Sequence, residues 1–354
     1  MPSIRLLGGP RSGSYSSFIR QAQSRPPAPA SSRHPLTVRA LKEVRTRREE
    51  NVPGDVYVDH TCIDCDTCRW MAPSVFGRVG DMSAVTRQPA TPEERQRALE
   101  ATISCPTFSI HMPRQSPEET AQLMSSFPLP ITGCRDVFHC GHHAESTFGG
   151  ASYFIRRPDG NILVDSPRWS PTLAARLEAL GGVDTIFLTH RDDVGDHARW
   201  AARFGAKRVL HRREMNARQG TDKVERPLDE TGPWSLGEGL TVYLTPGHTE
   251  GHAVLFYAPD AALLAGDHLF LSRRLGRLAI SITHNWYSLP RQLESVAELV
   301  DLPVRHVLPG HGRPMHFASA GEYRAAALEV LRCDGQWDDG RLRAVGGRTR
   351  ELQV

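Results

Sequence analysis

Three apolar segments end directly in loops that carry histidine and aspartate, and this repeated arrangement limits the fold more than any other feature. The segments read VDTIFLTH (183–190), ALLAGDH (262–268) and VRHVLPGH (304–311). Short apolar runs that end at turn-forming residues predict buried strands. A sheet brings the ends of its strands to a common edge, so we expect these polar residues to lie together at one site.

Segments with helical periodicity separate these strands. They read SPTLAARLEALGG (170–182), DHARWAARFG (196–205) and LPRQLESVAELVDL (289–302), and a Pro-Asp-Gly-Asn turn joins two apolar runs in SYFIRRPDGNILVDSP (152–167). That turn is typical of a β-hairpin, and the glycines after the first helix are typical C-terminal caps. Strands that alternate with helices predict an α/β layered fold from about residue 136 onwards.

Four of the seven cysteines lie in a separate region nearer the N-terminus. Cys62, Cys65 and Cys68 have the spacing C-x2-C-x2-C, and Cys105 is followed by proline. Three thiolates on one tight loop can hold three corners of an iron–sulfur cubane, and a distant Cys-Pro is a usual donor for the fourth corner. Structural zinc more often uses two separated C-x2-C pairs. A [4Fe–4S] cluster is therefore the favoured interpretation, and zinc is the alternative.

This region resembles a single-cluster bacterial-type ferredoxin over about residues 54–112. In that resemblance the four cysteines bind one [4Fe–4S] cluster within a small α+β domain. The segment TPEERQRALEATIS (91–104) predicts its helix, with Thr91 as the N-cap. One cluster implies one-electron transfer, or a structural or sensing role.

The histidine and aspartate motifs occur four times, as THRDDVGDH (189–197), PGHTEGH (246–252), GDHLF (266–270) and PGHG (309–312). This series, together with the hairpin that contains GNILVDSP, resembles the metallo-β-lactamase superfamily over about residues 136–320. The resemblance implies an αββα sandwich that binds two divalent metal ions, with zinc expected first and iron or manganese as alternatives. It implies the metal ligands His190, Asp196, His197, His248, Asp267 and His311, and Asp192 is a further candidate ligand at a position where the family has a histidine.

The resemblance also divides these residues by role. His190 and His248 bind the first metal. The second metal is bound by Asp196, His197 and His311. Asp267 bridges the two metals. A metal pair about 3.5–4 Å apart can clamp a scissile bond, and zinc lowers the pKa of bound water to about 7. Asp196 and Asp267 are therefore the expected catalytic residues, and no separate protein nucleophile is needed.

The first motif departs from the family pattern. The family reads T-H-x-H-x-D-H, whereas this chain has two extra residues and places Asp192 where the second histidine is expected, with Asp193 as a competing candidate. Mixed histidine and carboxylate sites suit iron or manganese better than nitrogen-rich zinc sites do. The flavodiiron branch of the superfamily also places a carboxylate here. The alternative is that Asp192 or Asp193 caps the following helix and binds nothing.

The motifs predict a metal-dependent hydrolase of an ester, thioester, lactone or phosphodiester, with a fused ferredoxin domain. The first alternative is a di-iron oxidoreductase that receives electrons from the cluster, although no flavodoxin-like segment follows residue 320. The second alternative is a redox sensor or assembly factor without catalytic activity. The expected partners are a small-molecule substrate and an electron-transfer protein.

The first 40 residues differ in composition from the rest of the chain. They are rich in serine, proline and arginine, with six arginines and no acidic residue. This composition is typical of an organellar transit peptide and predicts the chloroplast stroma, with the mitochondrion as the alternative. The remainder carries 37 basic and 40 acidic residues, so its charge does not favour nucleic acid. No apolar run reaches the about 18 residues that span a membrane.

The predicted organisation has five parts. They are a transit peptide (1–40), a ferredoxin-like domain (54–112), a linker (113–135), a metallo-β-lactamase-like domain (136–320) and a C-terminal helix with a tail (321–354).

Overall fold

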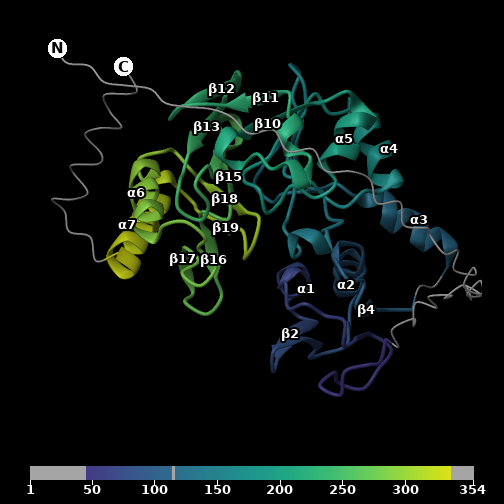
Figure 1. The fold of residues 1–354 in the computed structure, drawn as a ribbon. Coiled ribbons are helices and arrows are strands. Elements are labelled where there is room, and N and C mark those ends of the chain that lie inside the picture. Colours follow the sequence, from purple (N-terminus) through teal and green to yellow (C-terminus); the bar gives the residue numbers. More distant parts are fainter. Residues whose placement is uncertain (1–44, 114–115, 336–354) are drawn as a thin grey trace, which may run out of the picture. The chain divides into compact units, whose positions relative to one another are not determined.

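The computed structural model describes residues 45–113 and 116–335 (Figure 1). The predicted transit peptide at residues 1–40 lies outside the described residues, and so does the predicted C-terminal tail from residue 336. Within the described ranges, no helix combines the length and the apolar character that a membrane span requires.

The N-terminal part contains two short helices and two pairs of antiparallel strands. Its elements are β1 (Tyr57–Val58), α1 (Thr67–Met71), β2 (Phe76–Val79), β3 (Met82–Val85), α2 (Pro92–Ser104) and β4 (Ile110–His111). Strand β1 pairs with β4, and β2 pairs with β3. The Thr91 hydroxyl accepts the backbone N–H of Glu94, which confirms the predicted N-cap of α2.

A seven-stranded mixed sheet follows. Its order is β11 (Arg226–Leu228), β10 (Lys207–His211), β9 (Thr185–Phe187), β8 (Ile162–Val164), β7 (Tyr153–Ile155), β6 (Val137–His139) and β5 (Leu129–Pro130). Strands β8 to β11 are parallel, and β5 to β8 are antiparallel. The predicted hairpin is confirmed as the pair β7 and β8.

A six-stranded sheet is the second large sheet of the C-terminal part, which comprises residues 116–335. Its order is β12 (Trp234–Gly237), β13 (Leu240–Leu244), β14 (Ala253–Tyr257), β15 (Ala262–Gly266), β18 (His306–Pro309) and β19 (Met315–His316). A separate hairpin consists of β16 (Phe270–Ser272) and β17 (Arg277–Ala279). The remaining helices are α3 (Pro117–Ser126), α4 (Pro171–Ala179), α5 (His197–Phe204), α6 (Leu289–Leu299) and α7 (Ala320–Gly335).

The strands are buried on both faces, and successive side chains enter different cores. Tyr153 and Ile155 of β7 face strands of the other sheet, whereas Phe154 packs with α4 and α5. In the six-stranded sheet, Leu255 enters the core between the sheets, and Phe256 enters the core beneath α6 and α7. Figure 1 shows α6 and α7 side by side next to the six-stranded sheet. The three cores therefore separate four layers, which confirms the predicted αββα sandwich.

The segment expected to be a linker contains more structure than its prolines suggested. Helix α3 begins after Ser116, whose hydroxyl accepts the backbone N–H of Glu119. Strand β5 then pairs with β6 at the edge of the seven-stranded sheet. Phe127 is fully buried between them, so the apolar residues of this segment anchor it to the core.

Two arginines of the C-terminal part bind the cysteine-containing part. The Arg168 guanidinium donates to the carbonyl oxygens of Cys105 (2.9 Å) and Ile103 (2.6 Å). The Arg313 guanidinium donates to both carboxylate oxygens of Asp66 at 2.7 and 3.0 Å. Arg168 thus holds the end of α2 against the loop that follows β8, and Arg313 holds the loop of the first cysteines against the loop that follows β18.

Candidate metal centre

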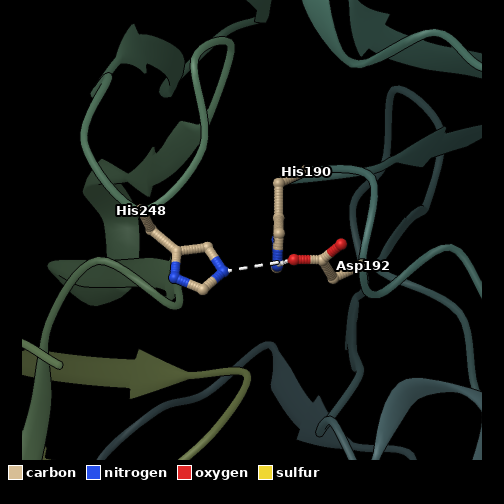
Figure 2. Close-up of side chains that lie close together, drawn as sticks. All are labelled: His190, Asp192 and His248. Carbon is tan, nitrogen blue, oxygen red and sulfur yellow. Dashed lines mark ion pairs between the residues drawn. The ribbon is translucent and has the colours of Figure 1, made fainter. Parts of the chain in front are cut away.

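Three loops bring four ligand atoms to one point. His190 follows β9, His248 lies between β13 and β14, and Asp267 directly follows β15. Asp192, two residues after His190, turns its Oδ2 atom toward the histidines. Figure 2 shows the rings of His190 and His248 directed toward this carboxylate.

The distances between these atoms match a metal coordination shell. Nε2 of His248 lies 3.4 Å from Oδ2 of Asp192 and 3.6 Å from Oδ2 of Asp267. Nε2 of His190 lies 3.8 Å from each of the same two oxygens. Ligand atoms arranged tetrahedrally about 2.1 Å from one ion are about 3.4 Å apart. His190, Asp192 and His248 are therefore spaced to hold one divalent ion, and Asp267 lies beside both histidines.

The ligand atoms lack other partners. Within the described residues, Nε2 of His190, Nε2 of His248 and Oδ2 of Asp192 are buried without a hydrogen bond. A buried polar atom without a partner costs about 1–3 kcal/mol, and a bound cation would satisfy all three together. These unpartnered ligand atoms show that the residues fit the expected metal ion.

Hydrogen bonds on the far side of each ring leave Nε2 free for a metal. Nδ1–H of His248 donates to the carbonyl oxygen of His284 at 2.7 Å. The Thr189 hydroxyl donates to the buried Asp165 carboxylate (3.0 Å) and accepts Nδ1–H of His190 (2.9 Å). Such contacts fix the tautomer and orientation of a metal-binding histidine.

A second group of ligand atoms lies beside the first and includes Asp193. The ligand atoms of His190, Asp193 and Asp267 also come within the mutual distance that one ion can bridge. Asp193 is buried, and neither of its carboxylate oxygens has a hydrogen-bond partner in the described part of the chain. Burial raises the pKa of Asp193 well above its ordinary value.

His311 reaches Asp267 as a hydrogen-bond donor. Nδ1 lies 2.9 Å from Oδ1 of Asp267, and Nε2 lies 2.9 Å from the carbonyl oxygen of Thr147. Both partners only accept, so both ring nitrogens carry protons and the ring is an imidazolium. Burial opposes this charge, but Asp267 and Asp193 outweigh it and raise the pKa of His311 to about 10. His311 must release a proton before it can bind a second metal.

The structure places Asp196 and His197 away from these groups, which corrects the predicted ligand set. Helix α5 begins at His197, and Oδ2 of Asp196 accepts the backbone N–H of Trp169. Nε2 of His197 contacts the carbonyl oxygen of Gln219, and its Nδ1 faces Arg208. The two extra residues of the motif therefore move its second half onto the helix, and Asp193 is the aspartate that the structure brings to Asp267. Because Asp196 occupies the N-cap position, Asp192 and Asp193 do not cap α5.

The cysteines fit a cluster better than a single ion. Burial raises the pKa of both Cys65 and Cys68, and the neighbouring thiols of Cys62 and Cys105 raise it further. The four thiols therefore lie near one another. Yet among the described residues, no group of cysteines comes within the 4.8 Å mutual distance that one ion would require. Sulfur ligands around one zinc ion would lie about 3.8 Å apart. The wider spacing agrees with a four-iron cluster.

A cavity of about 660 Å³ opens over the metal centre. Asp192, His248, Asp267 and His311 line it, together with Cys65 from the cysteine loop. Other lining side chains are aromatic, namely Phe148, Phe270 and Trp286. Sequence patterns did not indicate Phe148 and Trp286, because they lie on irregular loops whose positions depend on tertiary contacts.

Replacing Asp192 with asparagine is expected to weaken zinc binding by at least about 100-fold, because the variant removes one charged ligand. The matched control is Asp196→Asn, which changes an aspartate of the same motif that lies outside the metal centre. Competition with a chromophoric chelator measures both affinities. Equal zinc affinity in the wild type and Asp192→Asn would show that Asp192 does not bind the metal.

The two metal positions are expected to differ in pH dependence. Burial lowers the pKa of His190 to about 4, so its Nε2 is free at neutral pH. His311, with a pKa of about 10, holds a proton that a second zinc ion must displace. Below pH 10 the apparent affinity of the second ion should therefore rise about tenfold per pH unit. Zinc titrations at pH 6, 7 and 8 check this, and a second affinity that does not change with pH would contradict it.

Comparison with known proteins agrees with both halves of the structure. Residues 58–112 match the family model of the 4Fe-4S single cluster domain of Ferredoxin I, and residues 146–333 match that of the metallo-beta-lactamase superfamily. "Probable metallo-hydrolase YybB" of Bacillus subtilis is 27% identical over 155 residues, which cover 38% of this chain and 70% of that protein. A hydroxyacylglutathione hydrolase of Acidiphilium cryptum is 30% identical over 213 residues, 58% of this chain and 78% of that enzyme.

Among solved structures, the BLEG-1 B3 metallo-beta-lactamase aligns with a TM-score of 0.45 and 20% identity. The alignment covers 55% of this chain and 99% of that chain. The resemblances expected from the cysteine and histidine motifs are both confirmed by the family matches. The chain belongs to the metallo-β-lactamase superfamily and carries an N-terminal single-cluster 4Fe–4S ferredoxin domain.

Proposed function

We propose that this protein is a metal-dependent hydrolase that cleaves an uncharged ester, thioester or lactone. The observation that carries the proposal is the set of unpartnered ligand atoms of His190, Asp192 and His248, of which Asp192 and His248 line the cavity. When bound there, a divalent ion supplies a Lewis acid and lowers the pKa of water to about 7. The two relatives named above are called hydrolases, and the name of the one from Acidiphilium cryptum gives hydroxyacylglutathione as what it hydrolyses.

The charge of the cavity narrows the substrate class. None of the lining residues in the described ranges is lysine or arginine, whereas four are aspartates: Asp64, Asp66, Asp192 and Asp267. Asp66 is neutralised by Arg69 and Arg313, and Asp64 by Arg69 and Arg78. The imidazolium of His311 is already paired with Asp267 and Thr147, so without a lysine or arginine the cavity offers no free cationic side chain for the phosphate of a phosphodiester or the carboxylates of a glutathione moiety. These contacts favour a neutral acyl substrate.

A substrate panel tests this proposal. The chain is loaded separately with zinc, manganese and iron and is assayed with a neutral aryl ester, a neutral thioester, an aliphatic lactone, S-lactoylglutathione and an aryl phosphodiester. We expect the neutral esters or thioesters to be cleaved fastest and chelation to abolish turnover. Absence of hydrolysis with all three metals, or turnover that survives chelation, would contradict a metal-dependent hydrolase.

Trp286 is expected to bind the apolar part of the substrate. More than half of its side chain is exposed although it lines the cavity, and its backbone N–H donates to the carbonyl oxygen of His248 (2.8 Å). Trp286→Ala should raise KM for an aromatic acyl substrate about tenfold, because an aromatic contact contributes roughly 0.5–1.5 kcal/mol. Tyr287→Ala is the matched control, since Tyr287 is exposed next to Trp286 but does not line the cavity. An equal KM in both variants would remove Trp286 from the binding site.

We also propose that the protein works in the chloroplast stroma, with a soluble one-electron carrier as a partner of its cluster. The acid-free, arginine- and serine-rich composition of residues 1–40 supports this location. A fluorescent protein fused behind residues 1–60 tests it. Accumulation in mitochondria, or throughout the cytosol, would contradict a plastid location.

A further inference from the structure

The cysteine site and the metal centre share one cavity. Cys65, Asp267 and His311 all line it. Nothing in the hydrolytic reaction requires an iron–sulfur cluster at this place. The arrangement therefore raises the question of what passes between the two sites.

A single loop, residues 145–150, separates the two sites and touches both. A methyl group on Gly149 would lie 2.8 Å from Cβ of Cys65 and 3.2 Å from its Sγ. A methyl group on Gly150 would lie 2.7 Å from Oδ1 of Asp193. Because consecutive Cα atoms are 3.8 Å apart, the sulfur and the carboxylate are on the order of 10 Å from each other.

Hydrogen bonds fix the loop to both sites. The carbonyl oxygen of Thr147 accepts Nε2–H of His311, and that of Gly149 accepts Nδ1–H of His143 at 2.8 Å. The same edge of His143 lies 3.1 Å from the Thr67 hydroxyl, which is 3.3 Å from Sγ of Cys65. The hydroxyl donates to the sulfur when that sulfur is a thiolate, as cluster binding requires.

An ion pair gives a second connection. Arg313 lies two residues after His311, and its guanidinium binds the carboxylate of Asp66, the residue after Cys65. Its side chain and that of Asp66 are 15% and 23% exposed, so water screens this contact only partly. Charge added at one site is therefore only partly screened from the other.

We propose that the iron–sulfur cluster and the metal centre are coupled, so that the oxidation state of the cluster sets the metal affinity of the centre. Reduction by the proposed one-electron carrier, which is oxidised in the exchange, would add one negative charge to a bound cluster, and a divalent ion held at the metal centre would add two positive charges across the 145–150 loop. Opposite charges in a partly buried setting attract, so the metal ion favours the reduced cluster. Linkage requires the reciprocal effect, in which the reduced cluster strengthens metal binding by the same factor. The protein then joins a redox input to the loading of its hydrolytic site.

The experiment uses the full chain with its cluster intact and zinc as the probe, because zinc has no redox chemistry of its own. Zinc affinity is measured with the cluster oxidised and with the cluster reduced by dithionite, and the cluster midpoint potential is measured with and without zinc. We expect zinc to bind about tenfold more tightly to the reduced form. This corresponds to a positive shift of about 59 mV in the one-electron potential.

Two variants locate the effect. Asp267→Asn removes a carboxylate of the metal centre and should abolish the zinc-dependent shift in potential, whereas Asp196→Asn, outside the centre, should retain it. Equal zinc affinity in both oxidation states, absence of zinc binding, or a shift that persists in Asp267→Asn would each overturn the coupling. The readout does not use catalysis, so a failure to hydrolyse any substrate would leave this result interpretable.

Discussion

Asp267→Asn is expected to lower hydrolysis by about 10³-fold, the largest effect of any single ligand change. Oδ2 of Asp267 is within 3.8 Å of both metal-facing histidines, and its Oδ1 accepts from His311. Loss of one negative charge therefore weakens both groups of ligands. Metal ions contribute several kcal/mol of transition-state stabilisation, and about 4 kcal/mol corresponds to the stated factor.

Metal analysis and kcat/KM on the fastest substrate of the panel measure this effect. The matched control is Asp229→Asn, an exposed aspartate paired with Arg212 outside the cavity. The control should keep full metal content and activity. If Asp267→Asn also kept them, the observed group of carboxylates and histidines would not be the active site.

Cys68→Ala is expected to remove the cluster and unfold the cysteine loop and the strands around it in residues 45–90, whereas α2 stays packed in the core of the seven-stranded sheet. Burial raises the pKa of the Cys68 thiol well above its ordinary value, so without iron the site buries neutral thiols in place of a bound cluster. A region of this size has a small core, and a structural metal site can contribute about 10–16 kcal/mol, as much as a whole domain's stability. Iron content, visible absorbance and protease resistance report the loss.

The exposed Cys333 on α7 provides the control, because Cys333→Ala should keep four irons per chain. We also expect Cys68→Ala to open the cavity, since Cys65 and Asp66 form part of its wall. Retention of four irons in Cys68→Ala would contradict the assignment of Cys68 as a ligand. Zinc in place of iron in the wild type would support the alternative that the sequence left open.

Local patterns were sufficient to predict the strands and the loops of the metal centre. The motifs of His190, His248 and Asp267 follow or separate apolar runs, and each run is short enough to be a strand. The hairpin of β7 and β8 was equally clear, because its turn residues define it within 16 positions. Such features depend on residues that are close in sequence, so they can be recognised without tertiary information.

The register of the 190–197 loop could not be predicted in the same way. Gly195 adopts a φ of +42°, and a methyl group there would lie 2.4 Å from the carbonyl oxygen of Ser166. Gly150 likewise packs against the Asp193 carboxylate. These long-range contacts determine which aspartate enters the centre, and a motif two residues longer than the family pattern permits several choices. Sequence reasoning named Asp193 only as a competitor of Asp192.

The wall of the cavity was also beyond the reach of sequence patterns. Asp66 and Arg313 are separated by 247 positions, and no periodicity connects them. Phe148 and Trp286 stand on irregular loops, where an exposed aromatic residue carries no signal of its own. Residues that serve a site through tertiary contacts are visible only after the chain has folded.

The core of the seven-stranded sheet limits how this protein can be divided into separately expressed parts. Leu99 and Ile103 of α2 belong to that core, together with Phe127 and Trp200. Residues 113–145, which separate the two family matches, therefore do not mark a boundary between independent cores. A truncated protein that began after α2 would expose the apolar residues that Leu99 and Ile103 cover, so we expect it to aggregate.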